Sequence, residues 1–357
     1  MIDRRIQPRK IKILAINFGG LGDEILFFPA IKTIKSTFPS AELTLVTEPR
    51  SKAAKDLNFQ IDNVITCDIK GKNRYLNLLK LVTSLWGKKY KVVFSSGSSR
   101  FIPLILFLTG IRKRYGYNSG FLSKLLLSKA IPLKKDQYAG NMYHDLTRGI
   151  NLKEKADLPD IDVSSENILW ANVHIGLRDG KQVITVHPGV SKLSISKNMI
   201  KFWPVQNWVD LIIMLLSSGK YKVVLTGGPD DEDIIQRIRA EIAERDIPED
   251  DFVDLYKMTQ NISQLAAVFK LSDLLVCVDS APMHIGVGVR TSTVAIFGPT
   301  DEKKLLPPGD LRFVALKQSE LDCRPCLWDK RQTTCENPKC LNIDVDKVYK
   351  AVEDQLN

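Results

Sequence analysis

The chain has 357 residues and a mass of 40.2 kDa, which is enough for two domains that each bury a core. Hydrophobic residues make up 44% of it and charged residues 26%, so a disordered chain is excluded. No apolar run approaches the roughly 20 residues that span a bilayer, so we do not expect an integral membrane protein. The basic N-terminal residues precede a short apolar run that leads into a glycine-rich loop rather than a cleavage site, and we expect a cytoplasmic protein.

The net charge of +10 comes from one part of the chain. Residues 69–135 contain 15 Lys or Arg and no Asp or Glu, whereas the other 290 residues contain 36 basic and 41 acidic residues. Such a stretch predicts an anionic partner: lipid headgroups, a phosphorylated glycolipid or nucleic acid. The alternative is a solvated surface without a partner. The apolar run at 101–111 is too short to span a membrane and contains Pro103, so we expect a buried helix there.

Apolar runs typical of strands alternate with longer patterns of helical period, which predicts parallel sheets with crossover helices. In the first half we expect strands at 11–18, 43–47, 63–67, 91–95 and 113–117. We expect helices at 23–37, 75–86 and 101–108.

The second half repeats this alternation. We expect strands at 182–187, 222–226, 274–278 and 293–297, and helices at 205–217, 231–244, 263–270 and 283–289. The polar segment 151–180 is interpreted as a linker between the halves, and 344–355 as a closing helix. The sequence therefore predicts an α/β protein with two doubly wound domains, 1–165 and 166–357.

The first candidate site is a glycine-rich loop that ends the first strand and opens the first helix, Asn17-Phe18-Gly19-Gly20-Leu21-Gly22-Asp23-Glu24-Ile25. Open α/β sheets bind ligands at this place. A dinucleotide-binding fingerprint, however, would have glycine or alanine in place of Ile25, and an acidic first turn repels a pyrophosphate. Asp23 is either a helix N-terminal residue favoured by the helix dipole or a carboxylate that acts as general base.

Two further loops follow strands in the second half. His187-Pro188-Gly189-Val190-Ser191 is a small-residue turn with a hydroxyl group, and Lys201-Phe202-Trp203-Pro204 places a lysine just before a helix, an arrangement that suits a bound anion. Thr226-Gly227-Gly228-Pro229 leads into four acidic residues at 230–233, which are helix N-terminal residues or bind ribose hydroxyls. The candidate ligand-binding residues of these loops are Ser191, Lys201, Gly227 and Glu232.

The most specific pattern is Val278-Asp279-Ser280-Ala281-Pro282-Met283-His284, followed by Ile296-Phe297-Gly298-Pro299-Thr300. A strand, a turn and a helix start in succession place the amides of Ser280 and Ala281 at a positive helix end, where they can bind a diphosphate without a metal ion. His284 lies one turn into that helix. On its own it is more typical of a structural histidine than of a ligand.

Four of the six cysteines lie within 18 positions: Cys323, Cys326, Cys335 and Cys340. In a cytoplasmic chain, Cys-x-x-Cys followed by two more cysteines favours a metal-binding knuckle, for zinc or iron, over disulfides. The spacing is tighter than in common zinc ribbons, so a reversible disulfide and free thiols remain alternatives. Cys67 and Cys277 lie in strand-like runs and are expected in the core.

The order of these loops resembles one enzyme family. The succession G-x-G-D-x-x-x-x-x-P, H-P-G-x-S, K-x-W-P, G-G-P, D-S-x-P-M-H and F-G-P-T is similar to glycosyltransferase family 9, the ADP-heptose:lipopolysaccharide heptosyltransferases and their relatives. The resemblance extends from about Lys12 to the closing helix. It implies a GT-B fold, with two facing Rossmann-like domains and a cleft between them, the acceptor on the first and the nucleotide-sugar on the second. It also implies inversion at the anomeric carbon without a required metal ion.

The resemblance also assigns roles to residues. It implies that Asp23 is the catalytic carboxylate and that Lys201 neutralises phosphate. It implies a donor loop formed by Asp279, Ser280, Ala281 and His284. On the acceptor side we expect Gly20, Gly22, Arg112 and Arg114. The chain departs from the family pattern at Ala281, where glycine is usual, and by about ten extra residues at 192–200. Some relatives carry a comparable C-terminal cysteine cluster, so the segment 323–340 need not be catalytic.

We therefore predict an inverting glycosyltransferase that transfers a heptose or related sugar from a nucleotide diphosphate donor, ADP-heptose, to a lipopolysaccharide core or another anionic surface glycan. No cofactor is expected to be required for catalysis. The expected partners are the donor, the acceptor and the inner face of the inner membrane, which is contacted peripherally, and not nucleic acid. The alternatives are an NAD-type Rossmann oxidoreductase and a basic metal-knuckle protein that binds nucleic acid.

Overall fold

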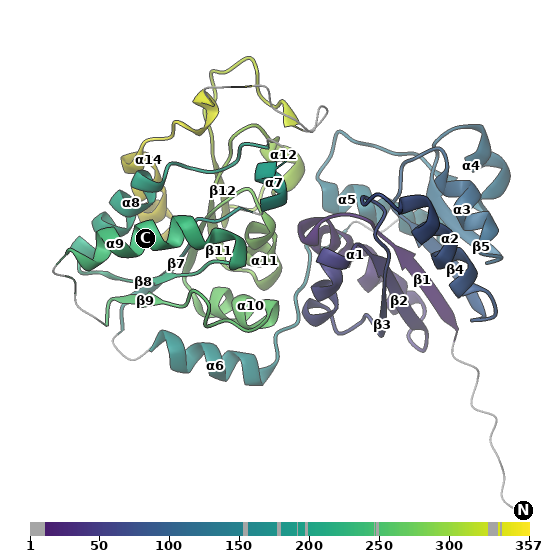
Figure 1. Ribbon diagram of the computed structural model, residues 1–357, viewed down its shortest axis with the longest axis horizontal. Coiled ribbons are helices and arrows are strands. Elements are labelled where there is room, and N and C mark those ends of the chain that lie inside the picture. Colours follow the sequence, from purple (N-terminus) through teal and green to yellow (C-terminus); the bar gives the residue numbers. More distant parts are fainter. Residues whose placement is uncertain are drawn as a thin grey trace, which may run out of the picture. The chain divides into compact units, whose positions relative to one another are not determined.

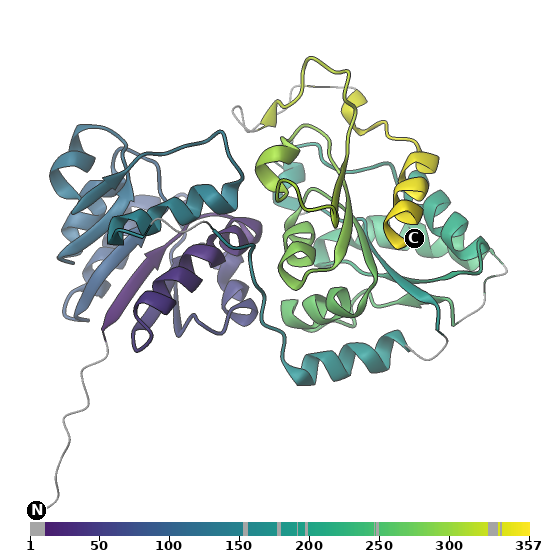
Figure 2. The same ribbon diagram turned by 180° about the vertical axis from the view of Figure 1, so that it is seen from behind.

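The computed structural model describes residues 11–152, 156–176, 180–190, 192–196, 199–245, 247, 250–327, 335 and 338–357. The chain divides into two compact units, residues 1–160 and 161–357. Each unit is a six-stranded parallel sheet covered by helices (Figure 1, and from behind in Figure 2). The boundary lies just before the expected one, because Ile161 already belongs to the second unit: its backbone N–H donates to the carbonyl of Gly288 (3.1 Å).

The first unit has the strand order β3-β2-β1-β4-β5-β6, and all neighbouring strands are parallel. Its strands are β1 (Lys12–Ile16), β2 (Glu42–Thr47), β3 (Asn63–Thr66), β4 (Tyr90–Ser95), β5 (Lys113–Tyr117) and β6 (Lys129–Ile131). Its helices are α1 (Leu21–Thr37), η1 (Pro49–Leu57), α2 (Arg74–Leu85), α3 (Ile102–Leu108), α4 (Phe121–Leu126), α5 (Ala139–His144) and η2 (Asp145–Ile150). Leu81, Leu85 and Leu106 join α2 and α3 to a core with Leu14 and Val93 of the sheet. On α1, Phe27 packs against Tyr143 of α5.

The second unit repeats this topology, with the strand order β12-β11-β10-β7-β8-β9 and parallel neighbours throughout. Its strands are β7 (Gln182–His187), β8 (Tyr221–Leu225), β9 (Phe252–Asp254), β10 (Leu274–Val278), β11 (Ser292–Ile296) and β12 (Phe313–Leu316). Its helices are α6 (Ser165–Ile175), α7 (Lys192–Ser196), α8 (Val205–Ser217), η3 (Pro229–Asp231), α9 (Glu232–Ala243), α10 (Ile262–Leu271), α11 (Ala281–Val289), α12 (Glu302–Leu305), η4 (Lys339–Leu341) and α14 (Val345–Leu356). The closing helix α14 joins the core through Val348 and Val352.

Every strand and helix that the sequence predicts is present, with bounds shifted by a few residues. The strands that the sequence analysis missed in the described part of the chain are β6, β9 and β12. All three are edge strands of three or four residues. Short edge strands pair on one side only and are not buried on both faces, so they lack the continuous apolar run of the central strands.

The interpretation of residues 151–180 as a linker holds for the unit boundary at 160/161 but was wrong for the part of the segment that forms α6. Ser164 caps this helix by accepting a hydrogen bond from the backbone N–H of Asn167 (3.3 Å). Ala171 and Ile175, four residues apart, are buried on the side that packs against α10. The polar residues on either side of α6 concealed it in the sequence, although six of its own eleven residues are apolar.

The expectation of a buried helix at 101–111 was also wrong. The run does form α3, but within the helix only Pro103 and Leu106 are buried. Phe101, Leu104, Phe107 and Leu108 are each at least 40% exposed. Apolar composition therefore does not report burial in this part of the chain.

The shared topology fixes where ligands are expected in each unit. The strand order reverses between β1 and β4 in the first sheet and between β7 and β10 in the second. Open parallel sheets bind ligands beyond the carboxyl ends of their strands at this reversal. Asp23 lies in the first helix after β1 and Asp279 follows β10 directly, so both carboxylates are at such a position.

Candidate active site

In the first unit, the glycine-rich loop fixes the carboxylate of Asp23. Its Oδ2 accepts a hydrogen bond from the backbone N–H of Gly20 (2.8 Å), and its Oδ1 accepts one from the hydroxyl of Tyr143 (2.9 Å). Gly19 must be glycine because the side chain of Asp23 folds over it: a Cβ on Gly19 would lie 2.1 Å from the Cβ of Asp23. Asp23 nevertheless stays partly exposed, and Gly22 lies beside it in the first turn of α1.

Asp23 is thus a helix N-terminal residue, as one interpretation predicted. This position does not prevent its carboxylate from also acting as a general base. Each carboxylate oxygen accepts one of the hydrogen bonds above and has a further lone pair for a substrate hydroxyl. Burial, followed by the charge of Asp23, raises the pKa of Tyr143 well above its ordinary value, so the phenol remains a donor. Tyr143 was not among the predicted site residues, because it comes from α5, 120 residues away from Asp23, and no motif marks it.

Glu24, the residue after Asp23 in α1, is fully buried. Its Oε1 accepts a hydrogen bond from the hydroxyl of Thr47, and the structure gives its Oε2 no partner among the described residues. Burial raises the pKa of Glu24 well above its ordinary value, and the charge of Asp23 raises it further. This favours the protonated form of Glu24, which reduces the repulsion between the two neighbouring carboxyl groups.

In the second unit, Asp279 is the centre of a buried ionic group. Its Oδ2 accepts hydrogen bonds from the ammonium of Lys201 (2.8 Å) and from the hydroxyl of Thr300 (2.5 Å). Burial acts to raise the pKa of Asp279, but Lys201, Thr300 and the nearby His284 outweigh it and hold the pKa below its ordinary value. The aspartate is therefore ionised at neutral pH, and the lysine is held at the carboxyl end of β10.

Lys201 is positioned by the tryptophan two residues after it. Trp203 is fully buried, meets Trp208 edge to face with ring centroids 4.9 Å apart, and donates a hydrogen bond from its indole N–H to the carbonyl of Ile343 (2.9 Å). The Lys-x-Trp-Pro pattern therefore combines an anchor with a charge. Because the lysine side chain is 19% exposed, part of the ammonium group remains accessible.

Thr300 is positioned by the cysteine-containing segment. The guanidinium of Arg324 donates to the carbonyls of Gly298 (2.5 Å) and Thr300 (2.9 Å), and the backbone N–H of Cys326 donates to the carbonyl of Pro299 (2.9 Å). The Phe-Gly-Pro-Thr loop, and with it the hydroxyl that contacts Asp279, is thereby attached to residues 324–326. Neither Thr300 nor Arg324 was among the predicted site residues, although Thr300 lies within a motif that the sequence analysis identified.

The helix α11 begins where the donor loop was predicted. Ser280 is its N-cap and Ala281 its first residue; both are partly exposed, with a proline in the first turn. Unpaired amides at such a helix start favour an anion. His284 is buried in the same helix, and its charge contributes to the low pKa of Asp279.

Of the remaining predicted residues of the second unit, the described ones contact partners other than Asp279 and Lys201. Glu232 forms an exposed ion pair with Lys257 (2.7 Å). Gly227 packs near Ile235 and Tyr256, with room for no more than a tight Cβ. Ser191 lies outside the described residues.

His187 and Gly189 form a structural support beside this group. Burial lowers the pKa of His187 to about 4, so the ring is neutral at neutral pH and its 3.7 Å approach to Asp231 is no ion pair there. Its Nδ1 is hydrogen-bonded to the hydroxyl of Thr226 (3.0 Å). A Cβ on Gly189 would lie about 2 Å from the carboxylate of Asp231, which in turn accepts from the backbone N–H of Gly228 (2.7 Å).

The two arginines predicted on the acceptor side differ in their surroundings. Arg112 is exposed. Arg114 is partly buried, and its guanidinium donates to the backbone carbonyls of Leu126 (2.6 Å) and Ile111 (2.5 Å). Arg114 therefore joins β5 to the end of α4, whether or not it also contacts an acceptor.

None of the four clustered cysteines is part of a disulfide in the described part of the chain. Burial raises the pKa of Cys340, and the neighbouring Cys326, Cys323 and Cys335 raise it further, so the four thiols lie in one region. Within the described ranges, no three His, Cys, Asp or Glu side chains form a group that could hold a metal ion. Residues 328–334 and 336–337, which flank Cys335, lie outside those ranges.

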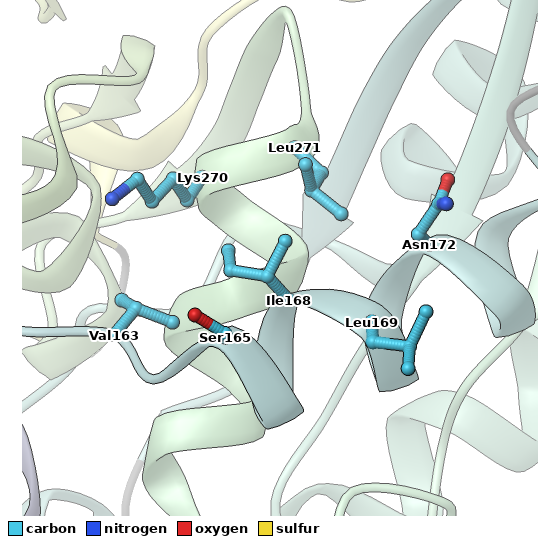
Figure 3. Close-up of a pocket in the computed structure, with 7 residues that line it drawn as sticks. All are labelled: Val163, Ser165, Ile168, Leu169, Asn172, Lys270 and Leu271. Atoms are coloured by element: carbon cyan, nitrogen blue, oxygen red, sulfur yellow. The ribbon is translucent and has the colours of Figure 1, made fainter.

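An open cavity of about 530 Å³ lies elsewhere in the second unit, between α6 and the end of α10 (Figure 3). Its lining is mostly apolar, with Lys270 as the one ionisable residue among those that line it. None of the motif residues contributes to it. The candidate site is therefore not this cavity but the carboxyl ends of the strands.

Comparison with known proteins identifies the class to which this geometry belongs. The family model described as glycosyltransferase family 9 (heptosyltransferase) matches residues 78–337, well over half of the chain. The chain therefore belongs to glycosyltransferase family 9 and is a glycosyltransferase, as the motifs predicted. The NAD-type oxidoreductase is not supported.

Particular relatives are similar over most of their length. Lipooligosaccharide heptosyltransferase 2 of Campylobacter jejuni is 24% identical over 344 residues, which cover 94% of this chain and 95% of the relative. Lipopolysaccharide heptosyltransferase 3 of Escherichia coli is 23% identical over 296 residues, which cover 78% of this chain and 80% of the relative.

Solved structures share the fold. A family 9 glycosyltransferase of Veillonella parvula superposes with a TM-score of 0.75 at 21% identity, covering 97% of both chains. The ADP-heptose lipopolysaccharide heptosyltransferase II of E. coli gives a TM-score of 0.73 at 20% identity, covering 97% of this chain and 98% of that one. The predicted GT-B fold is thus confirmed. Among the described helices, none is both long and apolar enough to cross a membrane.

Proposed function

We propose that the protein transfers a heptose or a closely related sugar from ADP-heptose to an anionic lipopolysaccharide-type acceptor, with inversion at the anomeric carbon. The observation that carries the donor assignment is the Lys201–Asp279–Thr300 group beside the start of α11, at the strand reversal of the second sheet. A fixed ammonium and a helix N-terminus together suit a diphosphate. The heptose and the acceptor are suggested by the names of the C. jejuni and E. coli relatives.

In the proposed reaction, Asp23 acts as general base. Its carboxylate takes the proton of the acceptor hydroxyl while that oxygen attacks the anomeric carbon. The bond between the anomeric carbon and the donor phosphate oxygen breaks, and ADP leaves with the electron pair. The hydrogen bonds from Gly20 and Tyr143 hold the carboxylate in one orientation. A general base must be fixed in this way to accept a proton from a bound hydroxyl.

The charge that develops on the departing diphosphate is met in the second unit. Lys201 has three N–H donors, so it can contact phosphate without leaving Asp279. Ser280 and Ala281 are partly exposed at the start of α11, where the backbone amides add a fixed partial positive charge. We propose that the reaction requires no metal ion, and turnover in the presence of EDTA tests that part of the proposal.

Thermal unfolding in the presence of nucleotides tests the donor class. We expect ADP to raise the unfolding midpoint more than UDP, GDP or NAD at equal concentration, since stabilisation grows with ligand concentration over Kd. Mass spectrometry of the nucleoside diphosphate released on incubation with candidate donors then identifies the sugar nucleotide. A midpoint raised only by NAD, with no nucleoside diphosphate released, would contradict the proposal.

We also propose that the acceptor approaches through the basic part of the first unit, with Gly20, Gly22, Arg112 and Arg114 on that side. The absence of acidic residues between 69 and 135 supports an anionic acceptor. A lipid-linked acceptor would bring the enzyme peripherally to the inner face of the inner membrane. Acceptor kinetics at rising salt concentration test this, since the apparent KM is expected to increase as the charges are screened.

The cysteine segment is proposed to hold one structural zinc or iron ion through Cys323, Cys326, Cys335 and Cys340. The proximity of the four thiols supports this, although the described residues do not themselves converge on a metal position. Elemental analysis of protein purified under reducing conditions is the test. We expect about one metal ion per chain, and its loss should destabilise the segment more than the first unit.

A further inference from the structure

The largest unassigned feature of the molecule is an apolar and basic surface on α2, α3 and α4, called here the α2–α4 surface. Of the eighteen large apolar side chains that are exposed in the described part of the chain, ten lie between Tyr75 and Leu125. They are Tyr75, Leu76, Leu79, Trp86, Phe101, Leu104, Phe107, Leu108, Phe121 and Leu125, each 40% to 78% exposed. Scattered exposed apolar residues are ordinary, but a concentration of this kind marks a contact surface.

Helical spacing directs these side chains outward together. Each helix, or the residues at its ends, presents an exposed pair four positions apart: Tyr75 and Leu79 on α2, Leu104 and Leu108 on α3, and Phe121 and Leu125 on α4. Residues four apart share one face of a helix. The opposite faces of α2 and α3 are already used for the core by Leu81, Leu85 and Leu106. These two helices therefore carry apolar residues on two sides, and folding of the unit buries only one.

Hydrogen bonds connect the three helices into one surface. The indole N–H of Trp86, just after α2, donates to the carbonyl of Leu108 at the end of α3 (2.9 Å). Arg114 donates to the carbonyl of Leu126 at the end of α4 and lies 5.4 Å over the ring of Phe107. Figure 1 shows the three helices grouped on one side of the first unit. The exposed apolar residues are thus neighbours rather than separate patches.

The charges on this surface are of one sign. Basic residues lie among the exposed apolar ones on each helix, such as Lys80 on α2, Arg100 just before α3 and Lys124 on α4, all exposed. The guanidinium of Arg100 lies 5.1 Å over the ring of Phe101. No acidic residue occurs between 69 and 135. A partner of this surface must offer both negative charge and an apolar interior.

We propose that the α2–α4 surface docks on an anionic lipid bilayer, with its aromatic and leucine side chains inserted between the headgroups and its lysines and arginines bound to lipid phosphates. A second copy of the chain is a poorer partner, because a symmetric contact would place the same positive surface opposite itself. Nucleic acid offers the negative charge, but it has no apolar interior that could bury the five exposed leucines of this surface. The proposal specifies the membrane part of the proposed function, on which it rests, but it is testable without the reaction.

Vesicle flotation with the full chain tests the proposal. Vesicles of phosphatidylcholine alone are compared with vesicles that also contain phosphatidylglycerol, neither containing an acceptor, at 0.15 M salt where the Debye length is about 8 Å. We expect binding to the anionic vesicles only. The double variant Phe121→Gln/Leu125→Gln and the triple variant Lys80→Glu/Arg100→Glu/Lys124→Glu should each reduce the bound fraction at least about fivefold. The chosen arginine is not Arg114, because its reversal would break the bonds to α4.

The matched control changes the same kind of residue in the other unit. Leu169 and Val173 on α6 are 63% and 69% exposed and also lie four positions apart. Leu169→Gln/Val173→Gln should bind vesicles like the unmodified protein. The thermal shift produced by ADP should be unchanged in all three variants, which shows that they fold. Because flotation requires no donor or acceptor, its result is independent of whether the proposed reaction is correct.

Fluorescence distinguishes insertion from electrostatic attachment. Anionic vesicles with brominated acyl chains should quench the emission of Trp86, and the quenching should be lost in Trp86→Phe. Vesicle binding that responds to salt but shows no such quenching would overturn the inserted arrangement. Equal binding by the variants of the α2–α4 surface and the unmodified protein would overturn the docking surface itself, as would binding to RNA but not to vesicles.

Discussion

The two sheets of this glycosyltransferase have the same topology and place a carboxylate at the same kind of position, but they surround it differently. Asp23 is held by neutral donors, a backbone amide and a phenol, and the acid behind it, Glu24, is buried in a way that favours its protonated form. Asp279 is held by an ammonium and a hydroxyl. Among the described residues no lysine or arginine forms an ion pair with Asp23, whereas Asp279 is paired with Lys201 and holds its ammonium group in place. In the proposed mechanism, the same fold thus supplies a base in one unit and an anion site in the other.

The largest expected effect is on the carboxylate without a cation. Asp23→Asn should lower turnover by about 10² to 10⁴-fold, because a positioned general base contributes this much. The affinity for ADP, measured by calorimetry, should be nearly unchanged, since the proposed donor site is in the second unit. Turnover like that of the unmodified enzyme would remove Asp23 from the chemistry and leave it as a helix cap.

For Asp279, which is paired with Lys201, we expect a change in both folding stability and ADP binding. Lys201→Ala leaves Asp279 buried without its partner, which costs about 3 to 5 kcal/mol of folding stability. It should also weaken ADP binding by about 10 to 100-fold, the value of a hydrogen bond to a charged group.

A double variant separates these two effects. Lys201→Met/Asp279→Asn removes both charges, so it should recover much of the stability in urea unfolding while still binding ADP weakly. If the double variant instead binds ADP as tightly as the unmodified protein, Lys201 serves the fold only.

One buried group in each unit favours its neutral form, and the two groups change folding stability with pH in opposite directions. Between its ordinary pKa of 6.5 and its folded pKa of about 4, His187 binds a proton only in the unfolded chain. Its contribution to stability is present above pH 6.5 and is lost as the pH falls, by about 2 kcal/mol at pH 5. For Glu24, whose folded pKa is raised, stability is full below its ordinary pKa of 4.5 and is lost as the pH rises. Urea unfolding across pH should show that His187→Gln removes the loss of stability below pH 6.5 and that Glu24→Gln removes the loss that begins above pH 4.5. Unchanged curves would contradict this.

The smallest expected effect comes from the phenol that orients Asp23. Tyr143→Phe removes one hydrogen bond, worth about 1 kcal/mol, so kcat should fall about fivefold with little change in KM. Tyr117→Phe is the control, since its hydroxyl donates to the carbonyl of Met142 (2.7 Å) and not to Asp23. Equal behaviour of the two variants would make Tyr143 a packing residue.

Local sequence predicted the central strands, the helices between them and the loops at their ends, because these depend on apolar periodicity and glycine. It could not predict the hydrogen bond of Tyr143 to Asp23 or the attachment of Thr300 by Arg324, since these contacts join residues 24 to 120 positions apart. It also could not show that Leu104 and Phe107 of α3 are exposed, because periodicity identifies the faces of a helix and not which of them the fold covers. The glycines at 19 and 189 were visible as loop residues, but their requirement for close contact with Asp23 and Asp231 was not.

The bonds of Arg324 to the carbonyls of Gly298 and Thr300 connect two parts of the second unit that sequence separates. If a bound nucleotide orders the Phe-Gly-Pro-Thr loop, these bonds also favour the ordered state of residues 323–327. Nucleotide binding and the ordering of the cysteine segment are then coupled. Linkage between two such equilibria is reciprocal. A nucleotide would then protect the cysteine segment from oxidants and proteases, and the chemical state of the thiols would in turn set the affinity of the donor site.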